Sequence, residues 1–88
     1  MEQRQVTKRE SVEKFANLME QVLQEKDPLY RDAYKHMDII SLEHRMIEEM
    51  GQYFYTCYRF QPLPTQDQIV RRLVHIANFC MLLADKYQ

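Results

Sequence analysis

The feature that most limits the fold of this chain is its shortage of residues that reverse the backbone, since 88 residues contain one glycine and three prolines. A β-sheet of this size would need several hairpins, and tight hairpins depend on Gly, Asn or Asp pairs at regular intervals. Hydrophobic residues nevertheless make up 45% of the chain. The composition therefore predicts one all-α domain over residues 1–88, built from long helices joined by short connections.

The first helix is predicted over residues 8–26. Apolar residues recur there every three or four positions, which places them on one face of a helix opposite a charged face. Thr7 and Glu10 have the spacing of a capping box, which predicts the start of the helix. The helix is expected to end before Pro28, because a proline disfavours helical backbone at the preceding residue. The stretch from 28 to 37 lacks periodicity and is interpreted as either a helical turn or an ordered loop.

Two further helices are predicted, over residues 38–60 and 66–86. Asp38 is a favourable cap for the second helix. Thr65 and Gln68 form another capping-box pattern at the start of the third. The connection between these helices is short, so they are expected to lie antiparallel and side by side.

Gly51 and the third helix both indicate close neighbours. Gly51 lies inside the second predicted helix, where glycine costs about 1 kcal/mol relative to alanine, so we expect another helix to approach closely there. The third helix carries two adjacent apolar stripes, one with Ile69 and Leu73 and the other with Val70 and Val74. Two stripes need partners on two sides. The antiparallel bundle of three main helices is therefore expected to be completed by self-association into a dimer or tetramer.

Charge and cysteine patterns restrict the partners and the compartment. The net charge of −1 argues against general nucleic-acid binding, which relies on neutralising phosphates. Residues 1–49 hold eleven of the thirteen acids, so the C-terminal half is mildly basic. Cys57 and Cys80 lie in apolar helical stretches without CxxC spacing and are expected to be buried, reduced thiols. With no apolar run of membrane-spanning length and no signal peptide, the sequence predicts a cytoplasmic protein without membrane association.

A family resemblance is carried by residues 69–87, which read IVRRLVHIANFCMLLADKY. This stretch resembles the last core helix of small phage and bacterial MazG-like proteins, the all-α nucleoside triphosphate pyrophosphohydrolases, in which an Ala-Asn-Phe-x-Met-x-x-Ala-Asp string recurs. The upstream stretches SLEHRMIEEMGQYF and FANLMEQVLQEKD are similar to the two preceding helices of that family. The resemblance implies a helical bundle and a triphosphate substrate bound with Mg²⁺.

The catalytic residues implied by the resemblance are largely replaced in this chain. The family uses Glu-x-x-Glu on one helix and Glu-x-x-Asp on the next, because acids three residues apart share a helix face and four carboxylates can hold Mg²⁺ on a triphosphate. Glu49, beside Glu48, keeps the first acid, but Gln52 stands at the second position. Arg72 and His75 stand at the third and fourth. We therefore expect no catalytic residue, metal or cofactor, with Glu48 and Glu49 as the remnant of a metal site.

Arg71, Arg72 and His75 permit two interpretations. One is a pocket for an anion or a nucleotide phosphate, since the arginine side chain binds phosphate without a metal. The other, which we favour, is that these residues are solvated or that Arg72 pairs with Glu48 or Glu49 across the helix interface.

Three functional hypotheses follow. The first is a catalytically degenerate, non-enzymatic interaction module, such as a phage accessory protein that binds a host protein through its helical faces. The second is a metal-independent protein that binds or sequesters a nucleotide with Arg71, Arg72 and His75. The third is an active pyrophosphohydrolase with unusual ligands, and Mg²⁺ is required only in that case.

Overall fold

The protein is all-α throughout the part of the chain that the computed structural model describes, namely residues 7–30, 33–58 and 62–88, with side chains placed up to residue 26 in the first range. The helices are α1 (Glu10–Tyr30), α2 (Ala33–His36), α3 (Ile39–Tyr58) and α4 (Gln66–Lys86). The predicted all-α class is thus confirmed, with a short fourth helix added, and the completion of a bundle by self-association stays a prediction.

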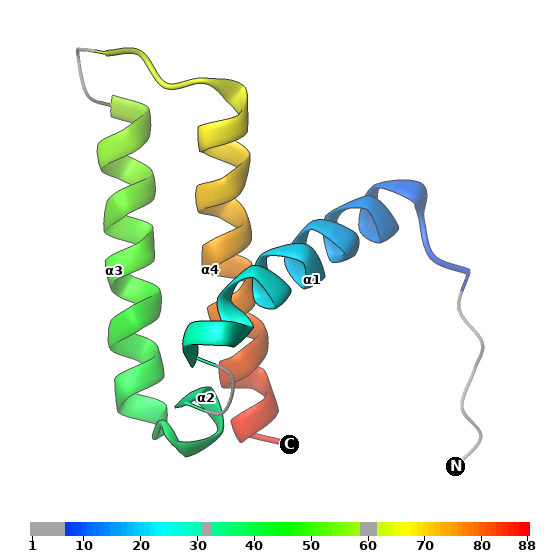
Figure 1. The fold of residues 1–88 in the computed structure, drawn as a ribbon, viewed down its shortest axis with the longest axis vertical. Helices are drawn as coiled ribbons and strands as arrows, with labels where there is room; N and C mark the ends of the chain where they lie inside the picture. The colour runs from blue at the N-terminus through cyan, green and yellow to red at the C-terminus, as the bar shows by residue number, and fades with distance from the viewer. Residues whose placement is uncertain (1–6, 31–32, 59–61) are drawn as a thin grey trace.

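Helices α3 and α4 form an antiparallel pair that lies side by side along the long axis of the molecule (Figure 1). Helix α1 packs mainly against α4, crosses it, and points its N-terminal half away from the pair (Figure 1). Helix α2 lies below the pair, beside the C-terminal end of α4 (Figure 1). Lys86 at that end donates from Nζ to the carbonyl of Lys35 at 2.9 Å, which fastens α2 to α4.

The starts of α3 and α4 follow the predicted caps. The backbone N–H of Ser41 donates to Asp38 Oδ1 at 2.7 Å, and this hydrogen bond lowers the pKa of the Asp38 carboxyl. At the start of α4 the N–H of Gln68 donates to Thr65 Oγ1 at 3.1 Å, and the N–H of Thr65 donates to Gln68 Oε1 at 3.0 Å. Both hydrogen bonds of the predicted capping box therefore form.

Both predicted ends of the first helix are wrong. Helix α1 begins at Glu10, and the carbonyl of Arg9 accepts the first helical bond, from Glu13, so Arg9 occupies the cap position where Thr7 was expected. The helix continues through Pro28 to Tyr30, because a proline disfavours helical backbone before it without forbidding it. In the stretch that follows, α2 bears out the helical-turn interpretation over residues 33–36. The predicted end of the second helix at residue 60 lies outside the described residues.

The core lies where α3 meets the C-terminal half of α4. Leu42 is fully buried and packs with Phe79 and Leu83, and Tyr34 of α2 meets the edge of the Phe79 ring in a T-shaped contact at 5.7 Å. Among the residues described, the buried apolar side chains are five in number: Val22, Leu42, Val74, Phe79 and Leu83. This is a small core for 88 residues, as size scaling leads one to expect. The predicted burial of both cysteines is wrong, because Cys57 is half-buried and Cys80 is exposed outside this core.

A large apolar surface remains on the side of α3 opposite α4. We define the outer face of α3 by the residues Ile40, His44, Ile47, Gly51, Phe54 and Tyr58, all of which are exposed. A Cβ atom added at Gly51 would meet no atom within 4 Å, so the close approach predicted at this glycine is not made by α4. As to membranes, the helices of the described ranges include none with the length and apolar character needed to cross a bilayer.

Candidate functional site

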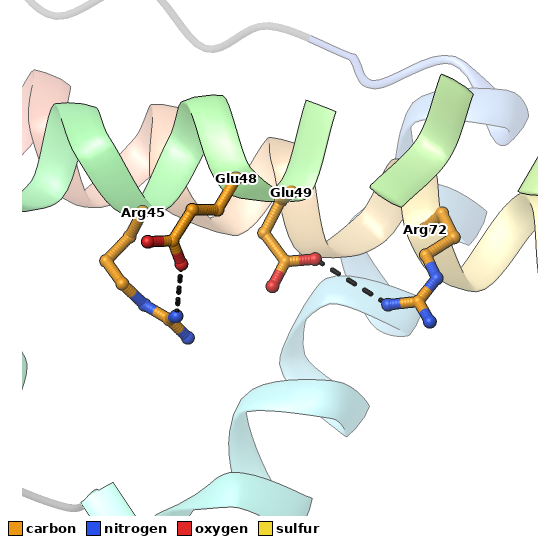
Figure 2. A network of polar contacts seen from close by, with 4 residues as sticks. All are labelled: Arg45, Glu48, Glu49 and Arg72. Atoms are coloured by element: carbon orange, nitrogen blue, oxygen red, sulfur yellow. Dashed lines mark hydrogen bonds and ion pairs between the residues drawn. The ribbon is translucent and has the colours of Figure 1, made fainter. Parts of the chain in front are cut away.

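The positions at which the resemblance implies metal-binding acids lie at the interface of α3 and α4. Glu49 of α3 extends toward Arg72 of α4, and Oε2 of Glu49 lies 3.9 Å from Nη1 of Arg72 (Figure 2). The Glu49 side chain is 14% exposed and that of Arg72 is 38% exposed. The structure therefore contains the cross-helix ion pair that the sequence offered as one interpretation of Arg72.

Glu48 turns away from this pair. Its Oε2 accepts a hydrogen bond from Arg45 at 2.8 Å, one turn earlier on the same helix, and both side chains are largely solvated (Figure 2). Neighbouring residues on a helix point about 100° apart, so Glu48 and Glu49 cannot both face one ion. Within the described ranges, no group of three or more His, Cys, Asp or Glu residues is placed to hold a metal ion.

Arg71 is directed to a different neighbour from Arg72. Its Nη2 donates to Glu25 Oε2 of α1 at 2.8 Å, which links α4 to α1. This pair borders a hollow of about 210 Å³ between α1 and α4, whose other walls include Val22, Val70 and Val74. Arg71 and Arg72 therefore connect α4 to two different helices and do not form one pocket.

His75 lines a separate small cavity between α1, α3 and α4, together with Glu49 and Asn78. Burial lowers the pKa of His75; Glu49 opposes this shift, while the nearby cations Arg71, Lys26 and Arg72 add to it. The imidazole is therefore neutral near pH 7. The cavity holds about 50 Å³, which is room for a water or two, whereas pockets for drug-sized ligands begin at roughly 300 Å³.

Asn78 is a residue of this site that the sequence analysis did not single out. It is buried, and its Nδ2 donates to the backbone carbonyl of Met19 at 3.3 Å, which adds a second link between α4 and α1. Among the described residues, its Oδ1 and the Oε2 of Glu49 are buried acceptors without a hydrogen-bond donor. The signal in the sequence is an amide within the apolar stretch from Ala77 to Leu83, where a polar side chain needs a specific partner.

Comparison with known proteins adds no family to this picture. No protein-family model matches the chain, and no curated protein or solved structure matches it either. The likeness to MazG-like proteins therefore rests on the residues quoted for it, and function has to be argued from the contacts described above.

Proposed function

We propose that this protein is a non-enzymatic helical interaction module that works as a homo-oligomer and binds protein partners through its exposed helical faces. The observation that carries the proposal is the contact between Arg72 and Glu49, 3.9 Å apart at the interface of α3 and α4. A cation occupies the place where the resemblance implies a ligand for Mg²⁺.

Electrostatics and geometry both oppose a metal at this position. Mg²⁺ requires near-octahedral oxygen ligands, usually carboxylates, phosphates and water. Glu49 supplies one carboxylate, Glu48 turns toward Arg45, and the guanidinium of Arg72 repels a divalent cation. The groups that would activate water on a triphosphate are thus replaced by a link between two helices.

Sequestering of a nucleotide is less well supported by the contacts. Arg71 and Arg72 each have a carboxylate partner, Glu25 and Glu49, on different helices. A phosphate group would have to displace Glu25 from Arg71, beside the hollow of about 210 Å³, or Glu49 from Arg72, beside the cavity of about 50 Å³ at His75, and could not bind both arginines in one pocket. The exposed apolar surface of α3 is a better candidate for binding, because patches of this kind mark protein interfaces. We propose the role of a phage accessory protein, with a host protein as the heterologous partner.

The test is an assay of pyrophosphate release by the full chain, with each nucleoside triphosphate and with or without Mg²⁺, alongside thermal-shift measurements under the same conditions. We expect no release and no shift in melting temperature, since specific ligands raise apparent stability by mass action. The matched variant carries Glu48→Gln and Glu49→Gln. Mg²⁺-dependent release that disappears in this variant would overturn the proposal. A shift without Mg²⁺ that Arg72→Glu abolishes would favour nucleotide binding instead.

A further inference from the structure

The outer face of α3 is an apolar stripe with one polar side chain, His44. At 100° per residue its positions, 40, 44, 47, 51, 54 and 58, fall within about 40° of one line along the helix. The buried residues of α3, Leu42 and Thr56, lie on the opposite side, toward α4. The side chains of Ile40, Ile47, Phe54 and Tyr58 are between 51% and 75% exposed. Nothing in the described part of the chain covers this stripe.

Gly51 lies in the middle of the stripe. It is the one glycine of the sequence, and glycine is the poorest helix former apart from proline. Because a Cβ there would meet no atom within 4 Å, packing inside the chain does not require glycine at this position. A helix surface without a side chain allows another helix to approach closely, so the space at Gly51 fits a side chain from another molecule.

We infer that a second copy of this chain docks antiparallel on the outer face of α3, with Ile47 of each copy packed over Gly51 of the other. The inference rests on the proposed function, since it names the partner for one of the helical faces. The six stripe positions are placed symmetrically about the middle of α3, which spans Ile39–Tyr58. A two-fold axis at residue 49 therefore brings Ile40 opposite the partner's Tyr58 and His44 opposite the partner's Phe54.

Charge selects the antiparallel orientation. The first half of α3 carries the exposed acids Glu43 and Glu48, whereas residues 50–58 contain no charged side chain. The two-fold axis at residue 49 puts Glu43 on the edge that carries the partner's uncharged Met50 and Phe54, and the two copies of Glu48 share the other edge once. A parallel pair would instead put each Glu43 on the edge that carries the partner's Glu48, which brings acids together twice, and would leave a void where the two glycines meet, so it would be disfavoured on both counts.

The available area is close to that of a stable interface. With aromatic side chains of 150–250 Å² each, the exposed parts of the stripe and of the flanking Met50 and Tyr55 amount to roughly 600–700 Å². Standard interfaces bury about 800 Å² per partner, and the largest apolar patch on a typical monomer is about 300–600 Å². One further copy would cover this area. The buried interface would then add to the core, which has five buried apolar side chains among the described residues.

Sedimentation of the full chain over a range of concentrations tests the inference. We expect a dimer for the wild type and a dissociation constant at least about tenfold higher for Ile47→Glu and for Gly51→Leu. Gly51→Leu is informative because the monomer has room for the added side chain, so the circular dichroism of the helices should be unchanged. Gln52→Leu adds the same side chain at an exposed position off the stripe and should leave the dimer unchanged.

Cross-linking tests the orientation. In a background with Cys57→Ala and Cys80→Ala, the double variant Ile40→Cys with Tyr58→Cys should form disulfide-linked dimers under mild oxidation. Each single variant should not, because the two copies of one such residue lie ~27 Å apart along an antiparallel pair, far beyond disulfide reach.

A monomeric wild type, an undiminished dimer of Gly51→Leu, or cross-linking of the single variants would each overturn the inference. A monomeric wild type would also contradict the homo-oligomer of the proposed function, whereas the other two outcomes leave that function standing. Pyrophosphate release tests its non-enzymatic part separately. An oligomer that forms through another face would likewise refute the docking of α3 alone.

Discussion

Arg72 Nη1 lies 3.9 Å from Glu49 Oε2 and makes no hydrogen bond to it, so these two residues link α4 to α3 through charge alone. Glu49 is mostly buried and Arg72 is more than a third exposed, so solvent screens the cation more than the anion. The pair neutralises a carboxylate at the helix interface, and beyond that it contributes little to the free energy of unfolding.

A double-mutant cycle measures this contact. With Glu49→Gln, Arg72→Met and the double variant, we expect a coupling free energy below about 1 kcal/mol, since solvent-screened pairs without a hydrogen bond are weak. Arg72→Met should destabilise more than Glu49→Gln, because it leaves a buried carboxylate without its cation. Urea denaturation gives the free energies, and the solvated pair of Arg71 and Glu25 is the comparison. A coupling of several kcal/mol would contradict this reading.

The pH dependence of stability should contain a contribution from His75, whose pKa is lowered in the folded protein. As pH falls through about 6.5, the unfolded chain gains a proton at this imidazole before the folded chain does. The free energy of unfolding should therefore fall below that pH and level off under the folded pKa. His75→Gln should remove this part of the dependence when urea midpoints are compared at pH values on both sides of 6.5. His36→Gln removes an exposed imidazole and serves as the control; identical curves for His75→Gln and the wild type would refute the prediction.

The core should respond to loss of Leu42 far more than to loss of another leucine. Leu42 is fully buried, so Leu42→Ala is expected to cost about 2–5 kcal/mol through lost burial and a residual cavity. Leu63 is 76% exposed in the connection between α3 and α4, and Leu63→Ala should change stability by less than about 0.5 kcal/mol. Thermal and urea unfolding of both variants check the difference. Similar losses of stability in Leu42→Ala and Leu63→Ala would mean that the core does not lie around Leu42.

The cap of α4 should be sensitive to the Thr65 hydroxyl. Thr65→Ala removes the acceptor for the Gln68 N–H and is expected to destabilise the protein by about 1 kcal/mol. Thr65→Ser keeps an oxygen at this position and should be nearly neutral. The unfolding midpoints of the two variants are the measurement. Equal losses of stability in Thr65→Ala and Thr65→Ser would show that the side-chain oxygen does not stabilise the cap.

The sequence predicted features that depend on neighbouring residues. The caps at Asp38 and Thr65 formed as expected, because each needs only a side chain and a backbone N–H three residues later. The end of α1 was missed, because the bias exerted by Pro28 on the residue before it competes with the rest of a long helix.

The candidate site was predictable only in part. The pairing of Arg72 with an acid of α3 follows from two adjacent helices, and it was among the expected arrangements. The pairing of Arg71 with Glu25 joins residues 46 positions apart, and the angle at which α1 crosses α4 decides it. Spacing within one helix carries no information on that angle, so the separation of Arg71 from Arg72 became visible only in the structure.

The way α1 is attached has a consequence for local opening. From Glu10 to Asn17, Phe15 is the one residue that is not exposed, and this half of the helix extends away from α3 and α4 (Figure 1). Few apolar contacts oppose its unwinding, so its backbone amides should exchange with deuterium long before those around Leu42 and Phe79, which open only when the whole molecule unfolds. Helix α1 should therefore open as a cooperative unit of its own, and the contacts of Val22, Glu25 and Met19 with α4 oppose that opening.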